Sequence, residues 1–185
     1  MYLNYDEILS VIEDGAMANT STECVNAASL DIRLGESIMV ETWSDYMRPL
    51  DYSKRDKLCM NTVKLSPAGY KIRPGEFFLA HTIEVCNFPD DLAALFRIKS
   101  SMGRIGLEHM DAGWIDPGFN GALTLEFKNM TTYHDIIIRP GDRIGQLIFL
   151  RGKPVSEEQS YRTKGNYNGS TSVKQVGYET TSSKV

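Results

Sequence analysis

The residues from Lys99 to Glu126 bring together three kinds of side chain that could do chemistry on one ligand. They begin with Lys-Ser-Ser-Met-Gly-Arg, whose cations, hydroxyls and glycine form a set that suits phosphate oxygens. One helical turn would place Ser100 and Arg104 on the same face, and the serine pair with Gly103 favours anion binding at a helix N-terminus. For this segment alone, a short connecting helix with a solvated arginine is an equally good interpretation.

Glu126 is a carboxylate in a very apolar neighbourhood, between Leu125 and Phe127. Burial there would raise its pKa toward the neutral range that an acid-base catalyst needs. Strand alternation would instead put Thr124, Glu126 and Lys128 together on one face, which could simply be solvated. Both interpretations stay open at this point.

The loop over residues 112–121 is rich in turn residues and holds one carboxylate, Asp116. An aspartate before Pro-Gly is most often a plain turn residue. Gly113 would let the backbone approach a ligand and leave room for a second water, and Trp114 could wall a pocket, although a core position explains the indole equally well. A phosphate-binding segment beside a carboxylate of raised pKa indicates chemistry on a nucleotide.

The composition of the chain is compatible with a nucleotide-binding protein and argues against several other classes of protein. The 185-residue chain suits one domain, and 42% hydrophobic and 24% charged residues are ordinary for a globular protein. The net charge of −4 argues against a general nucleic-acid binder. Three widely spaced cysteines favour free thiols in a reducing compartment. With no basic leader and no apolar run near the ~20 residues of a membrane span, we expect a cytoplasmic protein.

The first predicted element of secondary structure is an N-terminal helix. Acidic residues in its first turn and an apolar face predict a helix over residues 5–14, which Gly15 can end. Strict alternation predicts a strand over residues 29–34 that Gly35 closes, with residues 36–41 as its partner strand.

The rest of the chain is predicted to be mostly β. Strands flank Pro-Gly turns within residues 70–80 and 136–150, whereas residues 44–62 are polar and form a surface excursion. Such short strands imply a β-barrel or jelly-roll-like sandwich over residues 1–155. Residues 156–185 are rich in Ser, Thr, Gly and Asn, so we expect a flexible C-terminal tail that could close over an active site.

Zinc is disfavoured by the histidines and cysteines. Zinc-dependent nucleobase deaminases carry H-x-E followed by P-C-x-x-C. None of His81, His109 and His134 is followed two residues later by Glu, and there is no C-x-x-C. We therefore expect these histidines to be surface or hydrogen-bonding residues. There is also neither a Walker loop nor a Rossmann glycine fingerprint.

Five short motifs occur in a fixed order: NAASLDIRLG (26–35), KSSMGR (99–104), AGWIDPGF (112–119), TLE (124–126) and RIGQL (143–147). Together they closely resemble the dCTP deaminase family of the trimeric dUTPase superfamily, over roughly residues 5–167. The resemblance implies a mainly β fold, a distorted β-barrel of jelly-roll type with a short N-terminal helix, in a homotrimer with active sites at subunit interfaces. It also implies zinc-independent deamination, with Mg²⁺ held through the nucleotide triphosphate and no protein metal ligand.

The resemblance also implies roles for single residues. Glu126 would be the proton donor and acceptor, with Ser100 and Arg104 as further catalytic residues; Ser100 and a backbone carbonyl near Ala112 would orient the water. The nucleotide would be bound by Lys99, Ser101, Met102, Gly103, Ala112, Asp116, Thr124, Leu125, Gln146, Tyr161, Lys164 and Asn166.

The family's C-terminal lid motif is only partly kept. Tyr161 and Tyr167 match it, whereas Asn166 stands in place of its lysine and Ser170 in place of its glutamine. Lys164 could supply the missing cation.

The sequence thus predicts a cytoplasmic, homotrimeric dCTP deaminase in pyrimidine deoxynucleotide metabolism. Lys-Ser-Ser-x-Gly-Arg, Ala-Gly-aromatic and Ile-Gly-Gln-Leu are most like the bifunctional members, which form dUMP and pyrophosphate. Two alternatives stay open: a dUTPase, and an inactive nucleotide-binding regulator of the same fold. The expected partners are dCTP or dUTP, with dTTP as a candidate feedback nucleotide, and neither nucleic acid nor membrane.

Overall fold

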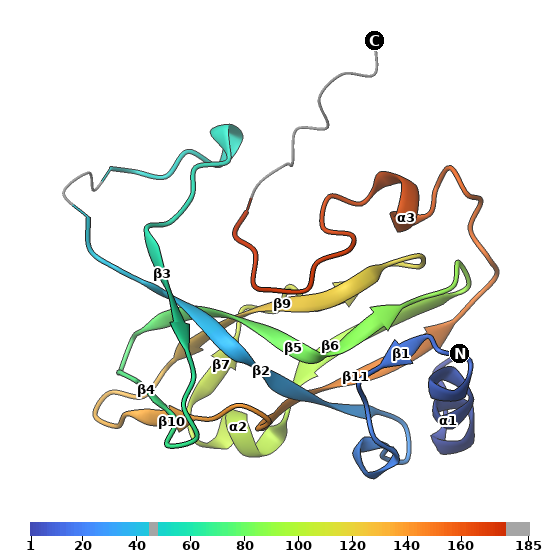
Figure 1. Ribbon diagram of the computed structural model, residues 1–185, viewed down its shortest axis with the longest axis horizontal. Helices are drawn as coiled ribbons and strands as arrows, with labels where there is room; N and C mark the ends of the chain where they lie inside the picture. The colour runs from blue at the N-terminus through green and yellow to red at the C-terminus, as the bar shows by residue number, and fades with distance from the viewer. Residues whose placement is uncertain (45–47, 177–185) are drawn as a thin grey trace.

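A curled, mainly antiparallel sheet carries the residues singled out above (Figure 1). The computed structural model describes residues 1–44 and 48–176. Within them, the main sheet has nine strands in the order β7-β9-β5-β2-β11-β6-β8, with β1 beside β5 and β3 beside β2. The strands are β1 (Met17–Ala18), β2 (Leu30–Glu41), β3 (Met60–Lys64), β4 (Tyr70–Ile72), β5 (Phe77–Asn87), β6 (Leu92–Ile98), β7 (Leu107–His109), β8 (Trp114–Ile115), β9 (Asn120–Asn129), β10 (Ile136–Ile138) and β11 (Arg143–Arg151). The prediction of a mainly β fold with one short N-terminal helix is confirmed.

Strand β2 joins the two halves of the sheet. Its first residues pair with β11, and its later residues pair with β5 and β3. The predicted break at Gly35, with a separate partner strand after it, is wrong because β2 continues through a register shift between Leu34 and Ile38. The His81 ring occupies the space that a Cβ at position 35 would need. Gly35 therefore permits a close approach inside a strand rather than ending one.

The predicted helix and the Pro-Gly turns are present. Helix α1 (Tyr5–Glu13) starts with a capping box between Asn4 and Glu7. Gly75 and Gly141 both have a positive φ, as their turns require. The strands that precede these turns, β4 and β10, pair with each other in a separate two-stranded sheet.

The core is formed by side chains from the inner faces of the curled sheet, together with residues of α1 and of connecting segments. Its largest fully buried members include five phenylalanines, Phe78, Phe88, Phe96, Phe127 and Phe149. Phe78 stacks on Phe127 at a centroid distance of 5.4 Å, and Phe96 meets Phe127 edge-on at 6.4 Å. This packing fixes β6 and β9, which lie on either side of the candidate site described below.

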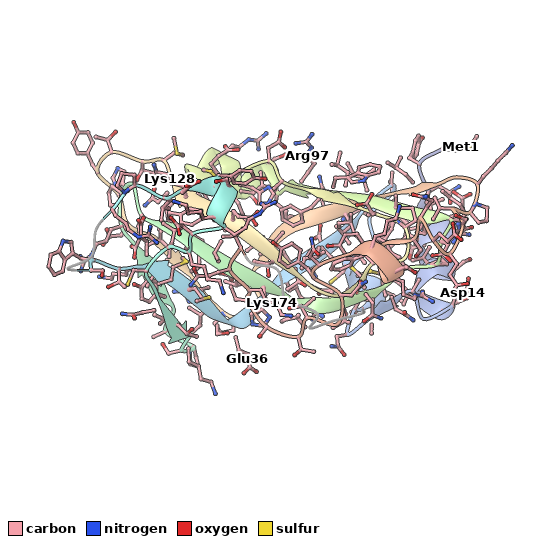
Figure 2. The ribbon with its side chains drawn as sticks, turned by 90° about the horizontal axis from the view of Figure 1, so that it is seen from above. Met1, Asp14, Glu36, Arg97, Lys128 and Lys174 are labelled. Carbon is pink, nitrogen blue, oxygen red and sulfur yellow. The ribbon has the colours of Figure 1, made fainter. Side chains whose placement is uncertain are left out.

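The predicted surface excursion is shorter than expected, because its last residues pair with β2 as β3. It contains the 3-10 helix η2 (Tyr52–Lys54), and residues 45–47 of it lie outside the described residues. A second 3-10 helix, η1 (Thr22–Cys24), precedes β2. Figure 2 shows Met1 and Asp14, which flank α1, at one end of the elongated molecule and Lys128 toward the other.

The C-terminal segment runs back across the sheet, and in Figure 1 it passes over β9 after the short helix α3 (Tyr161–Lys164). The hydroxyl of Ser160 donates to Asp90 at 2.6 Å. Further on, Ser170 forms a β-bridge with Gly121, and its carbonyl accepts from the Ala122 N–H at 2.7 Å. Polar contacts at Ser160 and Ser170 thus place the segment, and residues 177–185 of the predicted tail lie outside the described residues.

Candidate active site

A cavity of about 600 Å³ lies between β8, β9 and the C-terminal segment. Six residues predicted to bind or transform the ligand line it: Ala112, Asp116, Thr124, Leu125, Glu126 and Tyr161. The ring of Tyr161 packs on Phe119 at 5.4 Å, which fixes one wall. The structure therefore brings the loop, the β9 carboxylate and α3 to one place.

Glu126 enters this cavity from the partly exposed face of β9. Its side chain is 31% exposed, but its Oε2 atom is buried and has no hydrogen-bond partner among the described residues. Burial raises the pKa of Glu126 above its ordinary value. Glu126 thus shares the partly exposed face of β9 with Thr124 and Lys128, as alternation predicts, and it is also a partly buried carboxylate with a raised pKa.

His109 lies beside Glu126 and is a residue that sequence reasoning missed. It ends β7 and is 5% exposed, and its Nε2 atom is 3.7 Å from Oε2 of Glu126. The ring lies between Phe96 and Phe127, with centroid distances of 4.8 and 5.4 Å. Burial lowers the pKa of His109 to about 4, so the ring is neutral near pH 7. A lone histidine in a three-residue strand carries no sequence pattern that could have shown this.

Asp116 and Trp114 interact directly. The indole N–H of Trp114 donates to Oδ1 of Asp116 at 2.8 Å, and the indole is largely exposed while lining the cavity. The wall position for Trp114 is therefore correct and the core alternative is wrong. Gly113 lines the same cavity, and a Cβ there would lie 2.5 Å from the carbonyl oxygen of Phe96. Close contact with β6 is thus one reason for a glycine at this position, and approach to a ligand stays a prediction.

A second polar cluster surrounds the buried carboxylate of Asp31. Lys99 donates to both of its oxygens at 2.7 Å, and Asn26 donates to Oδ1 at 2.9 Å. Arg143 adds an ion pair at 3.5 Å, while Gln146 accepts from Ser29 at 3.1 Å in the same network. Of the predicted ligand-binding residues, Lys99 is thus held by a buried acid, and Gln146 is held by Ser29.

The predicted phosphate-binding segment forms the single helical turn expected of it, α2 (Ser100–Arg104). Ser100, Ser101, Gly103 and Arg104 are exposed, whereas Met102 packs on the core. Arg104 has no ion-pair partner within residues 1–44 and 48–176, so its guanidinium is available to an anion. No residue of α2 lines the cavity that holds Glu126.

The C-terminal segment covers the cavity with both tyrosines of the lid motif, Tyr161 and Tyr167, and with residues that the motif did not predict. Tyr167, Lys174, Gln175 and Val176 line it, and the Lys174 N–H donates to the Thr124 hydroxyl at 3.2 Å. The amide oxygen of Gln175 is buried without a partner among the described residues. Lys164 instead donates to Gln159 at 2.6 Å, and both it and Asn166 are exposed and outside the lining.

Two further features concern metals and membranes. Within the described parts of the chain, no three His, Cys, Asp or Glu side chains are grouped so that they could hold a metal ion. No helix in those parts is both long and apolar enough to cross a membrane.

The chain is similar to proteins of known family. A family model described as dCTP deaminase-like matches residues 2–152. A protein of Rhodococcus opacus (strain B4) named "dCTP deaminase, dUMP-forming" is 40% identical over 134 residues, which cover 72% of this chain and 70% of that protein. One of the same name from Mycobacterium sp. (strain KMS) is 39% identical over 155 residues, covering 82% of this chain and 80% of that protein.

A solved structure is similar as well. The crystal structure of 2'-deoxycytidine 5'-triphosphate deaminase from Agrobacterium tumefaciens matches 82% of this chain with a TM-score of 0.66 and 26% identity. The match covers 48% of that chain, so the present chain spans about half the length of this solved relative.

Proposed function

The chain belongs to the dCTP deaminase-like family, and from this premise we propose that it converts dCTP and water into a deoxyuridine nucleotide and ammonia. The observation that carries the proposal is Glu126, a partly buried carboxylate of raised pKa in the wall of a nucleotide-sized cavity. The same cavity holds Asp116 for a sugar and Thr124 for a pyrimidine.

The proposed reaction needs one group that moves protons in both directions. Glu126 takes a proton from the water that attacks C4 and gives it to N3 of the ring. It then takes the proton of the new C4 hydroxyl and gives it to the amino group, which leaves as ammonia while the C4 carbonyl forms. A carboxylate of ordinary pKa would be a poor acid at neutral pH, and burial shifts the pKa of Glu126 in the direction that this role requires. The backbone carbonyl of Ala112, in the cavity lining, can hold the water.

The proposed site is completed by a neighbouring subunit. Ser100 and Arg104 lie on α2, outside the cavity that holds Glu126 of the same chain. We therefore assign the Ser100 and Arg104 that act with a given Glu126 to another copy in a homotrimer. Exposed apolar side chains at Ile105 and Met110, on either side of β7, suit such a contact.

Mg²⁺ belongs to this proposal as a companion of the substrate. It binds phosphate oxygens and water more readily than all-protein cages, and it supplies charge neutralisation on the triphosphate when bound. The residues here fit that arrangement, because the oxygens of Asp31 already accept from Lys99 and the cation of Arg104 is available to phosphate. The free cysteines support a reducing compartment, and we place the enzyme in the cytoplasm.

We expect the products from dCTP to be dUMP, pyrophosphate and ammonia. The relatives at about 40% identity are named as dUMP-forming, which supports the expectation together with the position of Gly113 in the cavity lining. The test is to incubate the chain with dCTP, dUTP or dCMP and Mg²⁺, and to measure nucleotides, ammonia and pyrophosphate separately.

The same assay separates the alternatives. Accumulation of dUTP without pyrophosphate would identify a deaminase only, whereas pyrophosphate from dUTP without ammonia from dCTP would identify a dUTPase. Binding without any product would identify a regulator. Glu126 argues against the dUTPase alternative, because cleavage of a phosphoanhydride needs no proton donor to a pyrimidine ring. Adding dTTP to the same reactions tests feedback inhibition.

We also expect nucleotide to protect the C-terminal segment from hydrogen exchange. Residues 166–176 cover the cavity through a few polar contacts, including those of Ser170 and Lys174, and such segments open easily. Exchange there should be fast in the free protein and slower with Mg²⁺ and dCTP added to the Glu126→Gln variant, while peptides from α1 stay unchanged. Equal exchange with and without nucleotide would reject a lid function.

A further inference from the structure

Two buried polar atoms face each other beside the cavity without pairing. They are Nε2 of His109 and Oε2 of Glu126, which are 3.7 Å apart, and neither has a hydrogen-bond partner among the described residues. Buried polar atoms are almost always paired, so each exception calls for an explanation. An approach of roughly 0.8 Å would bring this pair to an ordinary N–H···O distance.

The surroundings of His109 fix its ring and keep it neutral. Phe96 and Phe127 lie on either side of it at 4.8 and 5.4 Å. Apart from Glu126, the charges that act on it are Asp111, which raises its pKa, and Arg97, which lowers it, and these two form an ion pair with each other. Burial outweighs both and lowers the pKa to about 4. A neutral ring carries one N–H, which can be at Nε2.

We propose that His109 is a positioning residue for Glu126: its Nε2–H donates to Oε2 and thereby holds the other carboxylate oxygen toward the cavity. The inference rests on the proposed function, since Glu126 is the group that moves the protons. Asp116, Lys174, Tyr161 and Tyr167 also line the cavity, and Oε2 accepts no hydrogen bond from any described residue.

The neutrality of His109 has a chemical consequence. A histidine with an ordinary pKa beside Glu126 would compete for the proton taken from water. Because His109 stays neutral, it donates a hydrogen bond without becoming a base, and the proton remains on Glu126 for delivery to the ring and the amino group. The orientation of the carboxylate and the retention of the proton thus come from the same buried ring.

The alternative is that His109 only fills space between two phenylalanines. Two variants separate these roles. His109→Phe keeps a buried ring and removes the nitrogen, whereas His109→Gln keeps an N–H donor near the position of Nε2. If His109 positions Glu126, the glutamine variant retains most activity and the phenylalanine variant does not, although phenylalanine suits the apolar surroundings better.

The experiment measures ammonia release from dCTP over a range of pH, together with thermal unfolding, for the wild type and both variants. In His109→Phe we expect kcat to fall roughly 10- to 100-fold, the effect of losing a hydrogen bond to a charged group, with KM changed less than about threefold. The acid limb of its pH profile should move to higher pH, because the ionised carboxylate loses a donor. His109→Gln should stay within about fivefold of the wild type.

Two results would overturn the proposal. The first is a His109→Phe variant with the kcat and pH profile of the wild type. The second is an equal loss of activity in both variants, accompanied by lowered melting temperatures. A readout independent of activity keeps the two proposals apart. In ¹⁵N NMR of the wild type, His109 should be the neutral Nε2–H tautomer at pH 7. If the wild type releases no ammonia, the proposed function fails. The positioning contact can then still be tested by measuring the pKa of Glu126 with ¹³C NMR. An equal pKa in His109→Phe and in the wild type would reject that contact as well.

Discussion

Replacing Glu126 with glutamine should abolish deamination while leaving the fold and nucleotide binding nearly intact. The amide has almost the same shape but cannot accept a proton, so we expect kcat to fall by at least the ~10²–10⁴-fold that general acid-base catalysis contributes. Stability should not fall, because Oε2 is already buried without a partner and the pKa of the carboxyl is already raised. Ammonia release, calorimetric binding of dCTP and thermal unfolding measure the three effects.

Lys128→Gln is the matched control. Lys128 is two residues further along β9 on the same partly exposed face, but it is not part of the cavity lining. It should keep activity within a few-fold of the wild type, since surface substitutions away from a site have small effects. Near-normal turnover in Glu126→Gln would show that Glu126 is an ordinary strand residue and that the proposed chemistry is wrong.

The features that could be predicted from the sequence are those that depend on residues close together in the chain. Helix α1, the two Pro-Gly turns and the single turn at α2 each depend on residues within a few positions of one another. The immediate neighbours of Glu126, Leu125 and Phe127, indicated burial, although alternation left a solvated face equally open. These features needed no knowledge of which strands meet.

The features that could not be predicted depend on contacts between residues that are far apart in the sequence. Gly35 was expected to end a strand, but its role depends on the His81 ring, which arrives from β5. The partner of Lys99 is Asp31, 68 residues earlier in the chain. Gln175 reaches the cavity because Ser170 bridges to Gly121, a pairing between segments about 50 residues apart that alternation and turn signals do not encode.

Replacing Arg104 with alanine should be nearly as damaging as the change at Glu126. Arg104 is an exposed cation on α2 with no ion-pair partner in the described parts of the chain, so its removal should not harm the fold. If it neutralises charge on the nucleotide, we expect activity to fall roughly 10²–10³-fold, as for the loss of one placed electrostatic contact. Arg139→Ala is the control, because Arg139 is also exposed but lies in a Pro-Gly turn. Equal effects of the two changes would argue against a site at α2.

Combining the two inactive variants tests where the halves of the site come from. Glu126→Gln and Arg104→Ala chains that carry different tags would be co-expressed. Tandem purification on the two tags would then isolate only the trimers that contain both kinds of chain. If each site takes Glu126 from one subunit and Arg104 from the next around the ring, either mixed trimer has one intact site and about one third of wild-type activity. If both residues act within one chain, every site carries a defect and no activity returns.

The cavity of a single chain contains Glu126 and lacks α2, so we expect activity to be recovered in the mixed trimers. Absence of recovery in mixed trimers of normal stability would require α2 to reach its own Glu126, through a rearrangement within the chain.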